Sequence, residues 1–266
     1  MMTYHDMQEA LMRELRLYHY PVAVNYFDSE EKLREFKAKA KYVTPVKATT
    51  YCQWETAARM QRKTVLATKD DLGCGNGQVG FGWKEMDTRD IESQLKYCVD
   101  LEQAERFQRS KPHLPMGWLK AIAAGPLGDC LFPPDVVHFY CDNLQSYHLA
   151  VDYMAATDSH PVRPMVLMSS ASCGGGVFCY QQQTLNMCPP CSGSYNAGKT
   201  ERGEVNVFIP GTQIEATVKR MLARIAGSGG ASVTRPGDPF PGGDICKNCP
   251  LIVFQQGNPD TDRAKK

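Results

Sequence analysis

The sequence predicts an α/β or α+β protein: a single mixed-sheet domain over residues 1–226, followed by a cysteine-bearing C-terminal extension over residues 227–266. Three observations predict this class. Strand-like segments alternate with amphipathic helices along the first part of the chain. Strand–helix units and a Cys/Gly-rich segment (residues 72–83 and 172–193) occur in both halves, which suggests an internal pseudo-repeat. Beyond residue 227, glycine and proline are frequent, as in an extended tether.

The first half begins with a helix and a strand. Apolar residues recur every four positions at Met7, Leu11 and Leu15, which is typical of a helix with one buried face. Residues 21–27 then alternate as a strand does. The acidic start of the next segment indicates a second helix, from Glu30 to about Lys37.

The second half repeats this order. Residues 134–140 have the composition of a strand, and apolar residues on one face predict a helix over about 144–151. Residues 204–210 form another strand-like segment. Thr212 and Glu215 then fit a capping box, T-x-x-E, at the start of the last helix.

Composition excludes several classes of partner. The 266 residues are 42% hydrophobic and 22% charged, with a formal net charge of +1. Such a balance provides no basic surface for nucleic acid or for a membrane. No apolar run approaches the roughly 18 residues of a membrane-spanning helix, and the N-terminus lacks the apolar stretch of a signal peptide. We therefore expect a cytoplasmic protein without nucleic-acid or membrane partners.

Cysteine is the most informative residue type. The chain has 11 cysteines, an odd number that a complete set of intrachain disulfides would not use up. Because cytoplasmic thiols are kept reduced, metal ligation or catalysis is the expected use of at least some of them.

Two C-x-x-C pairs, Cys188/Cys191 and Cys246/Cys249, are the first candidate metal ligands. Together they supply four thiolates, the ligand set of a structural zinc site or of an iron–sulfur cluster. The segment between the pairs is much longer than the roughly 15–20 residues of a small zinc ribbon. A shared site would therefore require the intervening strand and helix to fold back.

Three isolated cysteines, Cys52, Cys74 and Cys173, form a second candidate set for cofactor binding, alone or together with Cys191. Cys74 and Cys173 have glycine neighbours, which would let backbone amides approach a bound group closely. Cys52 lies at a predicted helix start, where the helix dipole would lower the pKa of its thiol.

Two glycine motifs match nucleotide-binding patterns without the context that those patterns require. Residues 193–200 fit G-x-x-x-x-G-K-[ST], and residues 75–80 fit G-x-G-x-x-G. Neither follows a strand and opens a helix, as phosphate binding requires. Nucleotide binding is therefore disfavoured.

Several segments together resemble the DUF169 family, uncharacterised proteins of archaea and anaerobic bacteria. They are Pro21–Val24, Tyr51-Cys52 with Ala57-Ala58, Cys74 with Gly80–Gly82, Pro134–Val137, and Cys191–Gly193 leading to Glu204 and Ile209-Pro210. The resemblance spans most of residues 10–225 and makes residues 1–226 a DUF169-like domain. It implies that Cys52, Cys74 and Cys191 lie where the family often has cysteine. Cys188 and the C-terminal pair are additions to that pattern.

These observations predict a metal-thiolate protein, with an iron–sulfur cluster, 4Fe-4S in type, as the expected cofactor. Its role would be electron transfer or cofactor handling in an anaerobic redox system, with a redox protein or a larger enzyme complex as partner, and a homo-oligomer is compatible with the sequence. Two alternatives stay open. One is a zinc-stapled binding or scaffold module without redox activity, and the other is a reactive-thiol enzyme with Cys52 as its nucleophile.

Overall fold

The computed structural model describes residues 2–228. The chain divides into two units, Met1–Arg220 and Met221–Lys266. Cys246 and Cys249, with most of the predicted extension, lie outside the described residues. Within the described range, none of the helices combines the length and the apolar character that crossing a membrane requires.

The first unit is built on one six-stranded sheet with the strand order β2-β3-β1-β4-β6-β5. The strands are β1 (Val22–Phe27), β2 (Val65–Ala67), β3 (Ala121–Pro126), β4 (Val136–Cys141), β5 (Asn186–Cys188) and β6 (Val205–Pro210). All five strand pairings are antiparallel, and parallel contacts are restricted to two isolated bridges, Thr44–Val65 and Thr49–Leu72. The sheet is thus antiparallel, within the predicted combination of helices and a single sheet.

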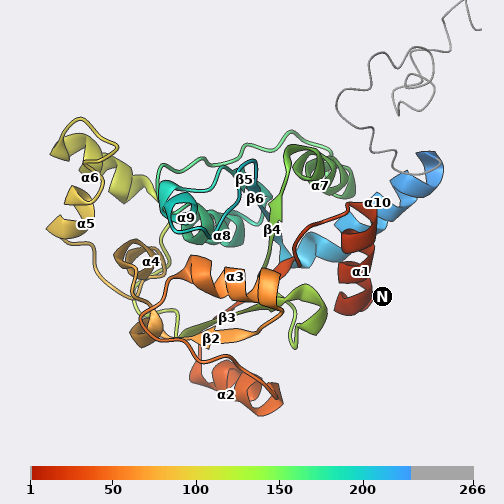
Figure 1. Cartoon of the computed structure of the whole chain (residues 1–266), viewed down its shortest axis with the longest axis horizontal. Coiled ribbons are helices and arrows are strands. Elements are labelled where there is room, and N and C mark those ends of the chain that lie inside the picture. The colour runs from red at the N-terminus through yellow and green to blue at the C-terminus, as the bar shows by residue number, and fades with distance from the viewer. Residues whose placement is uncertain (1, 229–266) are drawn as a thin grey trace, which may run out of the picture. The chain divides into compact units, whose positions relative to one another are not determined.

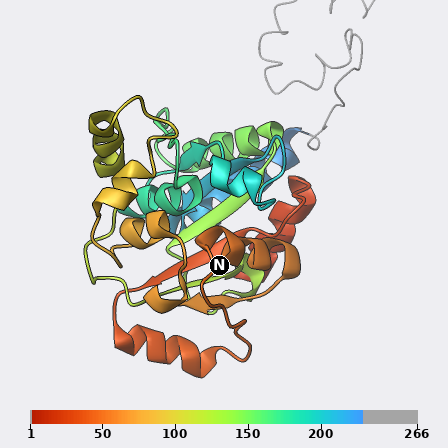
Figure 2. The same ribbon diagram turned by 60° about the vertical axis from the view of Figure 1, so that its left-hand side comes forward.

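Helices cover both faces of this sheet (Figures 1 and 2). The helices of the described residues are α1 (Tyr4–Glu14), α2 (Glu30–Lys39), α3 (Tyr51–Gln61), α4 (Gly75–Gly80), α5 (Thr88–Glu92), α6 (Leu101–Ser110), α7 (Asn143–Ala156), α8 (Ala171–Gln182), α9 (Ser192–Asn196) and α10 (Ile214–Ser228). The predicted face of β1, with Val22, Val24 and Tyr26, belongs to the main core under α3 and α8. Its other face, with Phe27, packs against Phe36 of α2. This alternation explains why all six residues of β1 are buried.

The order of the strands in the sheet is symmetric about its centre, which supports the expected pseudo-repeat. Along the chain, β1-α2-α3-β2-β3 is followed by β4-α7-α8-β5-β6, and the sheet places β1 next to β4, β3 and β6 outside them, and β2 and β5 at the edges. In each half the second helix, α3 or α8, packs on the same sheet face. The two halves are therefore related by a pseudo-two-fold axis between β1 and β4.

Strand register supports the same relation. Val22 pairs with Pro126 in the first half, and Val136 pairs with Pro210 in the second. Each of these prolines closes its strand and precedes a short 3-10 helix, at Leu127–Asp129 and at Gly211–Gln213. Between the halves, Ala23 pairs with Val137, which places the axis at this central pair.

One local prediction was wrong. Thr212 and Glu215 do not form a capping box: Thr212 lies within the 3-10 turn before α10 and its hydroxyl donates to Gln183 Oε1 at 3.2 Å, while Glu215 Oε1 accepts the backbone N–H of Met2 at 3.0 Å. The glycines after Cys173 lie within α8. They let α8 approach the sheet, because a Cβ on Gly175 would lie 2.6 Å from Cε2 of Phe208.

We expect Gly175→Ala to lower the free energy of unfolding by about 1–3 kcal/mol, because overpacking a buried helix–sheet contact costs about that much. Urea-induced unfolding measures the effect. Gly80→Ala is the matched control: Gly80 also lies in a helix, but a Cβ there would have Pro112 O as its nearest neighbour, at 4.0 Å. Equal stability of the two variants would contradict the tight α8 contact.

Candidate functional site: four cysteines at helix N-termini

Cys52 and Cys173 occupy equivalent positions of the two halves. Each lies in the first turn of its helix, Cys52 in α3 and Cys173 in α8. Each also lies ten residues before a residue that ends the helix with positive φ, Arg62 at 53° and Gln183 at 48°. The predicted helix start at Cys52 is confirmed, and Thr50 caps it through its side chain.

Cys74 and Cys191 form a second equivalent pair. Cys74 is the N-cap of α4, the first α-helix after β2, and Cys191 is the N-cap of α9, the first α-helix after β5. All four cysteines therefore lie at or within the first turn of a helix, where unpaired backbone N–H groups and the positive end of the dipole favour a negatively charged sulfur.

The four side chains gather where α3, α4, α8 and α9 begin. The hydroxyl of Ser194 lies 3.4 Å from Sγ of Cys52 and 3.8 Å from Sγ of Cys191, so one serine connects two of the cysteines. The thiol of Cys173 interacts electrostatically with those of Cys52, Cys74 and Cys191. Cys173 is buried and the other three are partly exposed. We call these four residues the cysteine site.

The site favours one thiolate over the others. Burial raises the pKa of Cys191, but backbone N–H groups of Ala171, Ser194 and Gly193 and the Ser194 hydroxyl outweigh it and lower the pKa below the ordinary value. Burial raises the pKa of Cys173 well above its usual range, and the neighbouring thiols raise it further. Four thiolates together would thus require added positive charge, which a bound metal supplies.

The pKa of Cys52 differs from the sequence-based expectation. Burial and the nearby Glu55 carboxylate raise it to about 12, although hydroxyl groups of Ser194 and Ser172 act in the opposite direction. Desolvation of the thiol therefore outweighs the helix dipole, and the predicted lowering was wrong. Among the thiols of the cysteine site, Cys191 is the better candidate for a nucleophile.

The sulfurs of the cysteine site are too widely spaced for one zinc ion. With Zn–S distances of about 2.3 Å, tetrahedral ligands lie about 3.8 Å apart. Among the described residues, the only three-ligand group of His, Cys, Asp or Glu atoms within 4.8 Å of one another is His19, Glu201 and Glu204. Arg59 already pairs with Glu204 at 2.6 Å and places a positive charge there.

Of the four cysteines in the two C-x-x-C pairs, Cys188 and Cys191 lie in the part of the chain that the structure describes. Cys188 is buried at the end of β5, and its Sγ lies 3.6 Å from the carbonyl oxygen of Ala171. Burial raises the pKa of this thiol to about 12. Its C-x-x-C partner, Cys191, belongs to the cysteine site, whereas Cys246 and Cys249 lie outside the described residues.

Beside the cysteine site lies a buried polar network that sequence reasoning missed. Glu55 and His138 are both fully buried, and Glu55 Oε1 contacts Nδ1 of His138. The Tyr140 hydroxyl donates to Glu55 Oε2 at 2.7 Å and lies 3.4 Å from the hydroxyl of Ser172, next to Cys173. His138 also stacks on Phe208 at a centroid distance of 4.0 Å, as expected of a core histidine.

An arginine holds the loop that follows α9. Arg59 is buried, its guanidinium donates to the carbonyl of Lys199 at 2.8 Å, and it pairs with Glu204. Burial alone would raise the pKa of Glu204, but His19 and Arg59 hold it at about 2. The G-x-x-x-x-G-K-T match, residues 193–200, covers most of α9 and a turn at Gly198 (φ 64°). The next element along the chain is strand β6, not a helix. This arrangement differs from a phosphate loop.

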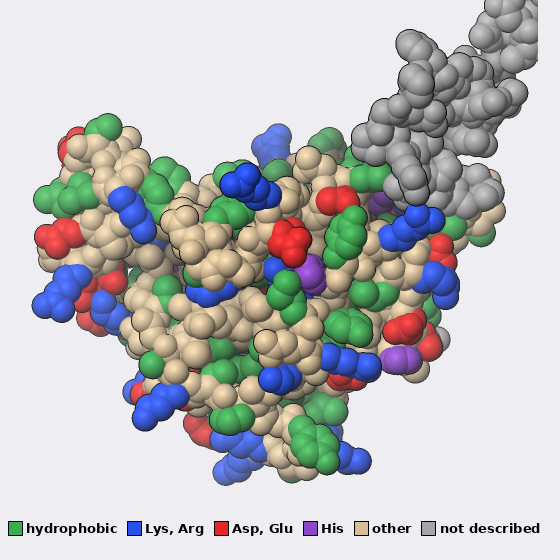
Figure 3. Space-filling view, in the orientation of Figure 1, with side chains coloured by type: hydrophobic (Ala, Val, Ile, Leu, Met, Phe, Trp, Pro, Cys, Tyr) green, Lys and Arg blue, Asp and Glu red, His purple; other side chains and the backbone are tan. Residues whose placement is uncertain are grey.

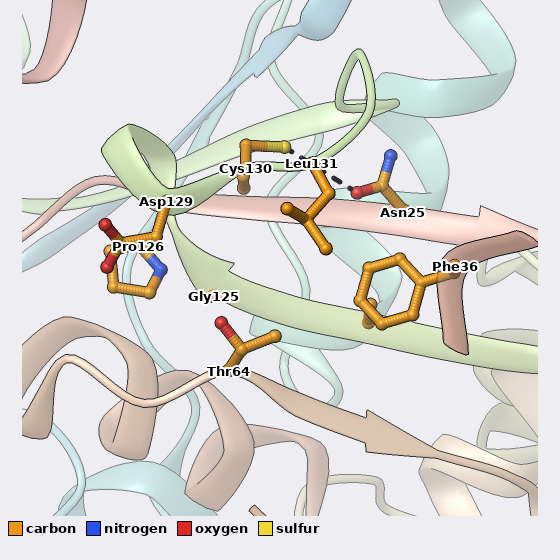
Figure 4. Close-up of a pocket in the computed structure, with 10 residues that line it drawn as sticks. Asn25, Phe36, Thr64, Gly125, Pro126, Asp129, Cys130 and Leu131 are labelled. Atoms are coloured by element: carbon orange, nitrogen blue, oxygen red, sulfur yellow. Dashed lines mark hydrogen bonds between the residues drawn. The ribbon is translucent and has the colours of Figure 1, made fainter. Parts of the chain in front are cut away.

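Cys130 shows a contrasting environment for a cysteine. It lines a small pocket on the opposite face of the sheet, together with Asn25 and Phe36 (Figure 4). Its Sγ donates to the carbonyl of Phe132 at 2.7 Å, and burial raises the pKa of its thiol to about 12. Cys130 therefore provides a control for substitutions in the cysteine site.

Charged side chains on the surface are mixed in sign. Positive and negative groups are interspersed over the face turned to the viewer in Figure 3, in keeping with the formal net charge of +1.

Comparison with known proteins identifies the family. The model of DUF169, described as an uncharacterised ArCR family, matches residues 10–220, so the chain belongs to this family. No curated protein and no solved structure shows significant similarity to it.

Proposed function

We propose that this DUF169 protein binds an iron–sulfur cluster through Cys52, Cys74, Cys173 and Cys191, and that it serves electron transfer or cofactor handling in an anaerobic redox system. The observation that carries the proposal is the pseudo-two-fold arrangement of the cysteine site. Two pairs of equivalent cysteines lie at helix N-termini. Ser194 lies beside Cys52 and Cys191, and the thiol of Cys173 interacts electrostatically with those of the other three. When bound, the cluster would supply one-electron redox chemistry.

The surroundings of the sulfurs support this use. Backbone N–H groups stabilise the thiolate of Cys191, the form of cysteine that binds iron. Hydrogen bonds to the sulfurs and solvent exposure tune the potential of such a site. The three partly exposed cysteines bring the site near the surface, where a redox partner could exchange electrons.

The proposal uses Cys191 from the first candidate set and all of the second set. Cys188 contributes to the core under the sheet instead, because its side chain is buried and contacts Ala171. The C-terminal pair is then not required for the cluster, and its role is open to direct test.

A second candidate function is thiol-dependent catalysis with Cys191 as the nucleophile. The observation that favours it is the lowered pKa of Cys191 at the N-cap of α9. This alternative predicts a protein without iron, in which Cys191 is alkylated at pH 7 much faster than Cys52.

Elemental analysis of the full-length chain, purified without oxygen, tests the proposal. We expect about four irons per chain, and the Cys246→Ser/Cys249→Ser double variant should retain them, because the four ligands lie in the first unit. Absence of iron from the wild-type protein would overturn the proposed function. Loss of iron from the double variant alone would transfer the ligand role to the C-terminal pair.

A further inference from the structure

Lys111 is a buried cation beside the cysteine site. It follows α6 in a segment between α4 and β3 that has no counterpart of similar length between α9 and β6; the helices of this segment, α5 and α6, project beyond the sheet in Figure 1. Only 5% of Lys111 is exposed. The segment that carries Lys111 breaks the pseudo-symmetry, because only residues 197–204 separate α9 from β6 in the second half.

The Nζ atom of Lys111 is surrounded by neutral acceptors. It donates to Oδ1 of Asn76 at 3.1 Å and to the hydroxyls of Ser169 and Ser170 at 3.2 Å each. Asn76 lies two residues after Cys74, and Ser170 lies three residues before Cys173. Lys111 therefore connects the segments that carry one cysteine from each half.

No carboxylate pairs with this cation in the part of the chain that the structure describes. Asp90, the acid that acts on it electrostatically, bonds instead to Nζ of Lys84 at 2.8 Å. A buried charge without a counter-ion is costly. The other groups that act electrostatically on Lys111 are the thiols of Cys173, Cys74 and Cys191, which become negatively charged when they lose their protons to bind a metal.

We propose that Lys111 is the counter-cation of the cysteine site, and that its charge stabilises the reduced state. This inference rests on the proposed function and specifies how the potential of the site is set. Reduction by a one-electron donor adds one negative charge among the four sulfurs. Lys111 attracts that charge in a buried region where water screens little, while its proton stays on Nζ and no bond to it forms or breaks. Lys111 is thus a positioning residue and not a ligand.

The test compares midpoint potentials of the full-length, iron-loaded chain in anaerobic titrations with dithionite. Lys111→Met removes the charge and keeps the length of the side chain. We expect the oxidised-to-reduced ratio at a fixed potential to rise about tenfold, which for a one-electron couple is about 59 mV towards lower potential. Lys111→Arg should stay near the wild-type value. Lys37→Met removes the same charge from an exposed position on α2 and should leave the potential unchanged.

The outcomes separate this inference from the proposed function. If every variant contains iron and if wild type and Lys111→Met have equal midpoint potentials, the role of Lys111 is overturned. The proposal that the chain binds a cluster would not be affected by that result. A wild-type chain without iron would overturn the proposed function itself. Should Lys111→Met fail to load iron, Lys111→Gln takes its place: it also lacks the charge but can still donate to Asn76, and an unchanged potential there would equally overturn the inference.

Discussion

Replacing Cys191 by serine is expected to reduce iron from about four per chain to less than one, and to remove the visible absorption of the cluster. The pKa of the Cys191 thiol is lowered below its ordinary value, because backbone N–H groups, two of them at the start of α9, outweigh the effect of burial and stabilise its thiolate. Serine keeps the size of the side chain but is a poor ligand for iron. Iron analysis and absorption spectra of protein purified without oxygen measure the loss.

The pseudo-symmetry adds a sharper form of this experiment. Cys52→Ser and Cys173→Ser alter equivalent positions of the two halves and should cause equal losses of iron. Cys130→Ser changes a cysteine on the other face of the sheet, where serine can still donate to the carbonyl of Phe132, and should retain all of the iron. Full iron and an unchanged spectrum in Cys191→Ser would rule this residue out as a ligand.

Replacing Glu55 by leucine is expected to lower the free energy of unfolding by about 3–5 kcal/mol, the cost of removing one partner from a buried pair. The substitution leaves His138 and the Tyr140 hydroxyl without their acceptor in a site from which water is excluded. Urea-induced unfolding of the full-length chain, followed by circular dichroism, measures the change.

A double variant tests the pairing itself. Glu55→Leu/His138→Leu removes both partners, so its loss of stability should be smaller than the two single losses added together. Glu35→Leu is the matched control, because Glu35 is half-exposed on α2 and pairs only with Lys39; we expect a change of about 0.5 kcal/mol or less. A Glu55→Leu variant as stable as this control would show that the buried network contributes nothing to stability.

Much of the fold follows from local patterns in the sequence. Short apolar runs predicted three of the four inner strands of the sheet, β1, β4 and β6, because both faces of these strands are buried. The short edge strands β2 and β5 were missed, as was β3, whose sequence Ala121–Pro126 is rich in alanine and glycine. Three residues at a sheet edge have too little pattern to distinguish them from a loop.

The sequence identified the cysteines of the candidate site but not their arrangement. Cysteine number and spacing indicated thiolate chemistry, and Cys52, Cys74, Cys173 and Cys191 were each recognised as candidates. The C-x-x-C spacing of Cys188 and Cys191 suggested that they act together, but β5 buries Cys188 while α9 begins at Cys191. Neither Lys111 nor Glu55 had a sequence signal, because each acquires its role from residues distant in the chain.

The sequence by itself therefore determined helices α1, α2, α7 and α10, the start of α3, and strands β1, β4 and β6, since those depend on neighbours a few residues apart. The tertiary structure alone decided which cysteines meet. That choice depends on the register of β1 against β4 and on the return of α3 and α8 to the same face of the sheet. Both are set by packing between segments more than 100 residues apart, such as Cys52 and Cys173, and no local pattern encodes contacts at that separation.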